Sequence, residues 1–87
     1  MKTKFSFEIM DLEDGLVAVP VGDKSSQFHG VLKVNETAAD IIKLLEKDTT
    51  EDMIVETMLQ EYDADKEQLT KYVHEFIATL KAEGIIE

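Results

Sequence analysis

The stretch GVLKVNETAADII, residues 30–42, holds the change from strand periodicity to helix periodicity that decides the fold. Before Asn35, Leu32 and Val34 alternate with Lys33, as in a strand with one buried face. After Asn35, apolar residues recur at the spacing of an amphipathic helix. The Asn35 side-chain oxygen can accept hydrogen bonds from the free amides at a helix start, which predicts that a helix begins at Glu36.

Upstream of this stretch the sequence predicts strands. Phe5, Phe7 and Ile9 alternate with Ser6, Glu8 and Met10, as in a strand with one buried face. Residues 16–21 form an apolar run interrupted only by Pro20, which belongs near a strand end or on an edge. Turns are expected at residues 12–15 and 22–26, where Gly can adopt positive φ. With a third strand over residues 28–34, the first part of the chain is expected to form a three-stranded antiparallel meander.

Downstream, three helices are expected. The first should run from Glu36 to about residues 47–48, and Thr49 or Thr50 should cap the second. Asp65 with Gln68 resembles a capping box for the third helix, which Gly84 should end. The whole chain, residues 1–87, therefore reads as one α+β domain of three antiparallel strands followed by three α-helices, with the shape of a small winged helix.

The charge argues against nucleic acid, although a winged helix suggests it. The chain has 19 acidic and 9 basic residues, a net charge of −10 and no Arg. Residues 36–65 alone hold ten acids against two lysines. A protein that binds DNA gains most of its affinity by neutralising phosphates, so this band would repel a duplex. No apolar run is long enough for a membrane span and no signal peptide is recognisable, so we expect a cytoplasmic protein that binds neither nucleic acid nor membrane.

No catalytic or metal-binding pattern is found. The chain has no Cys, and His29 and His74 lie far apart without suitably spaced carboxylates, so no metal site and no cofactor are expected. A carrier protein, which is also small and acidic, would need a Ser that opens a helix, whereas Ser25 and Ser26 lie in a predicted turn between strands. We therefore expect a binding protein and not an enzyme.

Across residues 30–42 the sequence resembles the PqqD family, whose members show a strand that runs into an Asn-Glu-Thr-Ala helix start. Residues 47–54 match the short break and Thr-initiated second helix of the family, and residues 76–86 match its closing helix with a Gly-apolar-apolar end. Lys47 and Asp48 replace the Gly that usually follows the first helix in the family. This difference weakens the assignment to the pyrroloquinoline quinone (PQQ) pathway more than it weakens the predicted fold.

The resemblance implies a RiPP precursor peptide recognition element, a peptide chaperone. Such a protein binds the leader of a ribosomally made precursor and presents it to a modifying enzyme of radical SAM or ATP-dependent type. In the family the leader adds as a strand to the third strand and lies against the third helix. By position, the expected peptide-binding residues are Phe28, His29, Gly30, Val31, Leu32, Lys33, Lys71, Tyr72, Glu75, Phe76 and Thr79.

Two other interpretations remain open from the sequence. Tyr72 and Phe76 lie on the apolar stripe of their helix, so they can serve the core as well as a peptide site. The chain could also be an acidic winged-helix adaptor between proteins, without a leader-peptide role. A strand that is free to pair could, in addition, form a homodimer.

Overall fold

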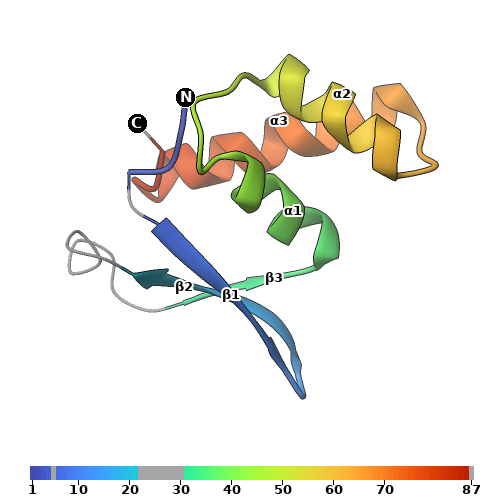
Figure 1. Cartoon of the computed structure of the whole chain (residues 1–87). Helices are drawn as coiled ribbons and strands as arrows, with labels where there is room; N and C mark the ends of the chain where they lie inside the picture. Colours follow the sequence, from blue (N-terminus) through green and yellow to red (C-terminus); the bar gives the residue numbers. More distant parts are fainter. Residues whose placement is uncertain (5, 22–30, 87) are drawn as a thin grey trace.

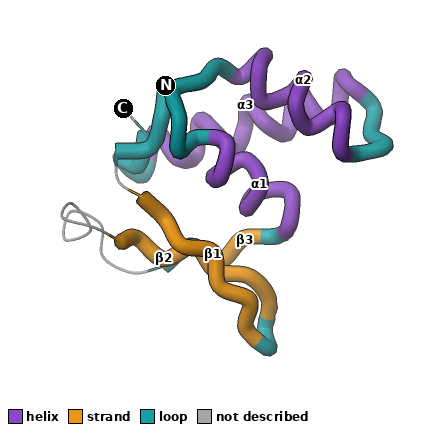
Figure 2. The backbone as a smooth tube through the Cα atoms, in the orientation of Figure 1, coloured by secondary structure: helices purple, strands orange, loops and turns teal. Residues whose placement is uncertain are grey.

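The computed structural model describes residues 1–4, 6–21 and 31–86, which form a small sheet beneath a layer of helices (Figures 1 and 2). The predicted α+β order of three strands and then three helices is confirmed. The elements are β1 Ser6–Leu12, β2 Gly15–Val21, β3 Leu32–Val34, α1 Glu36–Leu44, α2 Glu51–Glu61 and α3 Lys66–Ala82.

The sheet is antiparallel, with the order β1-β2-β3. Leu12 pairs with Gly15, so residues 13 and 14 form the predicted tight turn. Gly15 has a φ of +123°, a conformation that residues with a side chain rarely adopt. β2 pairs with β1 along its whole length but with β3 only at Leu16–Ala18, so Pro20 lies beyond the part of β2 that β3 covers.

The third strand is shorter than predicted in the described part of the chain. β3 covers Leu32–Val34, and Val31 lies outside the strand and is exposed. The expected strand positions 28–30 fall outside the described residues. Leu32 and Val34 are half-buried and Lys33 is exposed, which is the predicted alternation of faces.

α1 begins where the sequence predicts and ends earlier. The Asn35 side chain accepts a hydrogen bond from the Ala38 amide, which confirms it as the N-cap. The helix ends at Leu44, about one turn before the expected residues 47–48. The reason is tertiary, because the Leu45 carbonyl accepts from the Thr3 amide at 3.1 Å and so ties the fully buried Leu45 to the first residues of the chain.

The caps of α2 and α3 follow from local sequence. Of the two candidates, Thr50 caps α2, and Asp65 caps α3 by accepting from the Gln68 amide. After α3, Gly84 has a φ of +75°, and the Ile85 amide bonds back to the Leu80 carbonyl at 2.9 Å. This 6→1 bond with a left-handed Gly is a Schellman motif, the stop that Gly84 predicts.

The core lies between the helices and the inner face of the sheet. α1 contacts all three strands, and α2 packs on α3. The isolated bridge between Thr3 and Ile86 brings the two chain ends side by side (Figure 1). No helix within residues 1–4, 6–21 and 31–86 is long and apolar enough to cross a membrane.

Candidate functional site

The outer edge of β3 is the first component of the site. Within the described residues, β3 pairs with β2 on one side and with no other strand. Leu32 and Val34 pack against the core, so the strand is held firmly although it is short. An edge strand of this kind presents backbone N–H and C=O groups that an incoming strand can pair with.

An aromatic pair on one flank of α3 is the second component. Tyr72 and Phe76 stack, with ring centroids 6.4 Å apart and an interplanar angle of 22°. Both rings are half-buried and pack against the core. Thr79 continues the same flank, because residues at i, i+4 and i+7 share one side of a helix, and it is exposed. The two aromatic residues therefore serve the core with part of their surface and leave the rest accessible.

A hydrogen bond joins these two components. The Tyr72 hydroxyl donates to Oδ1 of Asn35 at 3.3 Å, and Asn35 directly follows β3. The same oxygen accepts from the Ala38 amide at 2.8 Å. The hydroxyl end of Tyr72 is thus held at the residue that directly follows the edge strand.

The other predicted site residues are less closely grouped. Lys71 lines a shallow hollow on α3 together with His74 and several polar residues, away from the flank of Tyr72. Glu75 is exposed, and its carbonyl accepts from the Thr79 hydroxyl at 3.1 Å. Phe28, His29 and Gly30 lie outside the described residues.

Asn35 is the residue that sequence reasoning missed as a member of this site. The sequence assigned it a helix-capping role, which is correct but incomplete. Its second donor, the Tyr72 hydroxyl, lies 37 positions away in the chain. A cap signal is local, so it contains no information about such a distant partner.

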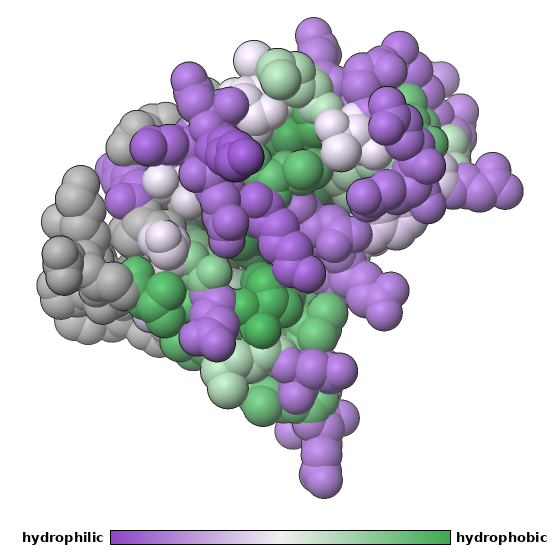
Figure 3. Space-filling model, in the orientation of Figure 1, coloured by the Kyte–Doolittle hydropathy of each residue, from purple (hydrophilic) through white to green (hydrophobic). Residues whose placement is uncertain are grey.

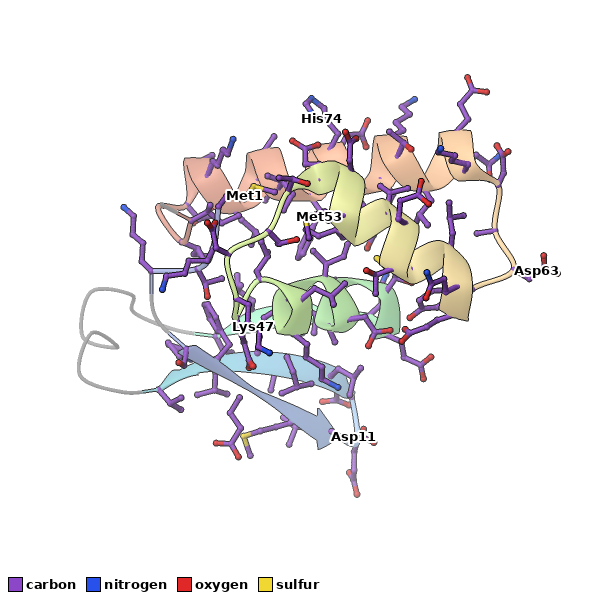
Figure 4. The ribbon with its side chains drawn as sticks, turned by 45° about the horizontal axis from the view of Figure 1, so that its top comes forward. Met1, Asp11, Lys47, Met53, Asp63 and His74 are labelled. Carbon is purple, nitrogen blue, oxygen red and sulfur yellow. The ribbon has the colours of Figure 1, made fainter. Side chains whose placement is uncertain are left out.

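Other polar contacts lie within the helical layer. The Tyr62 hydroxyl donates to a carboxylate oxygen of Asp40, and this bond, together with the desolvation of the phenol, raises the pKa of Tyr62 to about 12. His74 Nδ1 lies 2.9 Å from Glu51 Oε1 on the side of the helices remote from the sheet (Figure 4). No cluster of three or more potential metal ligands occurs within the described ranges.

Comparisons with solved structures find the same fold in other proteins. The chain is similar in structure to "TbiB1 in Complex with the TbiA(beta) Leader Peptide", with a TM-score of 0.74, 20% identity and coverage of 100% of this chain and 95% of that one. It is also similar to "Lasso peptide synthetase B1 complexed with the leader peptide", with a TM-score of 0.66, 17% identity and coverage of 97% and 93%. No curated protein sequence matches the chain.

The sequence itself matches one family model. The match to "Coenzyme PQQ synthesis protein D (PqqD)" spans residues 9–86, nearly the whole chain. It includes all three helices, β2, β3 and most of β1. The chain belongs to the PqqD family.

Proposed function

We propose that this protein binds the leader segment of a ribosomally synthesised precursor peptide and presents it to a modifying enzyme. The observation that carries the proposal is the position of β3 at the edge of the sheet, with the residue that follows it hydrogen-bonded to Tyr72 of the aromatic flank of α3. Membership of the PqqD family and the likeness to two proteins solved with leader peptides support it.

In the proposed complex the leader adds to β3 as a further antiparallel or parallel strand. Main-chain hydrogen bonds supply part of the affinity and are insensitive to sequence. The exposed parts of Tyr72 and Phe76 supply an apolar contact for leader side chains, which makes the interaction selective. Several hydrogen bonds worth about 1 kcal/mol each, together with a few buried side chains, suffice for micromolar affinity after ordering of the peptide.

The protein acts in this proposal without chemistry of its own. The enzyme that modifies the precursor, of radical SAM or ATP-dependent type, would supply the reaction, and this chain would hold the substrate. The acidic band of residues 36–65 belongs mainly to α1, α2 and the segments that flank them, so it leaves β3 and the α3 flank without a strong excess of either charge. Such a site suits a peptide better than a nucleic acid.

The test is an NMR titration of the labelled protein with a synthetic leader, taken from a precursor encoded beside its gene. We expect the amides of residues 31–34 and of the α3 flank to shift and those of α2 to remain unchanged. A scrambled peptide of the same composition is the control. If the leader binds without shifting residues 31–34, the strand-addition site is wrong.

Two threonines on α3 provide a matched pair of variants. Thr79 and Thr70 are both exposed, and each hydroxyl bonds to the carbonyl four residues earlier. Thr79 lies nine residues after Thr70. Because each residue turns the helix by about 100°, this separation places the two side chains on opposite sides of α3. Thr79→Arg should weaken leader binding by about tenfold or more, and Thr70→Arg should leave it unchanged. Equal effects would exclude the α3 flank as the binding surface.

A further inference from the structure

The first hairpin determines which backbone groups of the sheet point to its edges. Leu12 and Gly15 pair across a two-residue turn, so they form a hydrogen-bonded pair. Along an antiparallel ladder such pairs alternate with non-hydrogen-bonded pairs. Gly15 and every second residue after it therefore bond to β1, whereas Leu16 and Ala18 direct their N–H and C=O groups toward β3. Pro20 fits this alternation, because its nitrogen, which has no hydrogen to donate, points away from β1.

The same alternation continues into β3. Leu16 pairs with Val34, and Ala18 pairs with Leu32. The backbone N–H and C=O groups of Leu32 and Val34 are therefore used by β2. Lys33 lies between them, so its N–H and C=O groups point to the outer edge of the sheet. Within β3 the backbone of Lys33 is thus the part that an added strand can bond to.

The residue after β3 adds a further donor at this edge. Asn35 has an extended backbone, with φ of −97° and ψ of −180°, so its N–H points to the same side as the N–H of Lys33. The Asn35 amide donates to none of the described residues, whereas its carbonyl accepts from the Ala39 amide at 2.9 Å as part of α1. The edge therefore presents two donors, the amides of Lys33 and Asn35, and one acceptor, the carbonyl of Lys33.

We infer that these three backbone groups set the register of the bound leader, an inference that rests on the proposed strand addition. One leader residue lies opposite Lys33, and its side chain takes the outer face of the sheet, as the exposed Lys33 side chain does. The leader residues on either side of it face the core, as Leu32 and Val34 do. The recognised segment is therefore an apolar residue, a residue of any kind and a second apolar residue.

The surroundings of the two flanking positions favour apolar side chains. Leu32 and Val34 pack against the core, and Tyr72 and Phe76 of α3 pack against the same core with part of their rings. The Tyr72 hydroxyl bonds to Asn35, so this ring lies at the Val34 end of the strand. Figure 3 shows hydrophobic residues gathered over the sheet, beneath a largely hydrophilic helical layer. A strand added at the edge of the sheet extends this apolar part of the surface.

The middle position differs because its cross-strand neighbour is the exposed side chain of Lys33. A polar or charged leader residue keeps its hydration there. The main-chain bonds to Lys33 form whatever this residue is, so the middle position fixes the register without selecting a side chain.

Amide hydrogen exchange measured by NMR tests the assignment of the edge groups. In the free chain the amides of Leu32 and Val34 should exchange more slowly than those of Lys33 and Asn35. A saturating concentration of the synthetic leader should slow exchange at Lys33 and Asn35 by about tenfold or more. If the leader binds without protecting these two amides, the register is wrong although the proposed function stands. A leader that does not bind at all overturns the proposed function and the register with it.

Proline substitutions at the two edges of the sheet provide a matched pair of variants. Lys33→Pro removes an edge donor without removing a bond to β2, so the fold should be retained. Asp11→Pro makes the same change at the edge of β1, because Asp11 is exposed and its N–H points away from β2. Lys33→Pro should weaken leader binding by about tenfold or more, and Asp11→Pro by less than about twofold. Equal effects in two variants that circular dichroism shows to be folded overturn the inference.

A third variant tests the alternation without the leader. Val34→Pro removes a hydrogen bond to β2, so its urea midpoint should fall well below that of Lys33→Pro. Equal midpoints would contradict the assignment of Val34 to β2 and of Lys33 to the edge.

Substitutions in the synthetic leader test the recognised pattern. Replacing its residues one at a time by Ser should weaken binding by about tenfold at two positions that are separated by one tolerant position. Two adjacent sensitive positions, or sensitive positions three or four apart as on one face of a helix, would overturn the pattern.

Discussion

The helical half and the sheet half of this molecule differ in how fully they bury their hydrophobic residues. Of the described strand residues only Phe7 and Ala18 are buried, whereas the buried hydrophobic residues of the helices and their flanking segments number fourteen. Three of the four exposed large hydrophobic residues belong to the sheet half. The comparison indicates that the helices supply most of the stability and that the sheet, held against them by α1, is the surface available for partners.

The largest effect should come from a cavity in the helical half. Ile54 on α2 is fully buried, and Ile54→Ala should lower the free energy of unfolding by about 3 kcal/mol through lost burial and the cavity left behind. The adjacent Met53 is exposed, so Met53→Ala should change the free energy of unfolding by less than about 0.5 kcal/mol. Urea denaturation of the two variants measures both changes. Similar losses in the two variants would contradict the assigned core.

The next effect concerns Asn35, where the two halves meet. Asn35→Ala removes the acceptor for both the Ala38 amide and the Tyr72 hydroxyl, so a loss of about 1–2 kcal/mol is expected. Thr50→Ala removes a cap with a single partner, the Met53 amide, and should cost about 1 kcal/mol or less. Urea denaturation of the two variants compares their losses in free energy of unfolding. If Thr50→Ala loses more than Asn35→Ala, the hydrogen bond from Tyr72 to Asn35 does not stabilise the fold.

Within the helical half, the hydrogen bond from Tyr62 to Asp40 should make a contribution to the free energy of unfolding that depends on pH. Tyr62→Phe should lower the free energy of unfolding by about 1 kcal/mol at neutral pH. The pKa of Tyr62 is raised from 10.0 to about 12 in the folded chain, so the unfolded chain loses this proton first as the pH rises. The difference between wild type and Tyr62→Phe should therefore be constant from neutral pH to about pH 10 and shrink between pH 10 and about 12. A difference that is unchanged across this range would contradict the assigned bond.

The smallest effect should come from the ion pairs between α2 and α3. His74 pairs with Glu51 and Lys66 with Glu56, but both basic side chains are largely exposed. His74→Gln and Lys66→Gln should each change the free energy of unfolding by less than about 0.5 kcal/mol. Thermal denaturation of both variants checks this. A large loss from either would mean that surface charges, and not the buried core, hold the two helices together.

Local chemistry made much of the fold predictable from the sequence. Asn35, Thr50, Asp65 and Gly84 each act on backbone groups within a few residues, and each marks the helix end that it was expected to mark. The family resemblance in residues 30–42 is also confirmed. The end of α1 was misplaced because a backbone bond to Thr3, more than forty residues away, decides it.

The site was less predictable because it depends on which surfaces meet. Alternation identified Phe7 and Ile9 as the inward residues of β1, but the continuous apolar run of residues 16–21 has no period from which to assign faces. The stacking of Tyr72 on Phe76 follows from their spacing, whereas the contact of Tyr72 with Asn35 does not. The peptide-binding role of Phe28, His29, Gly30, Val31, Leu32, Lys33 and the α3 residues stays a prediction, as does the assignment of residues 1–87 to one domain.

The shared oxygen of Asn35 has a mechanical consequence. One atom accepts from the first turn of α1 and from the side chain of α3 that stands at the end of the edge strand. A peptide that draws the Tyr72 hydroxyl away would leave this oxygen entirely to the Ala38 amide and tighten the start of α1. Occupancy of the strand edge would then be transmitted, through a single acceptor, to the first turn of α1, where Glu36 is exposed to solvent.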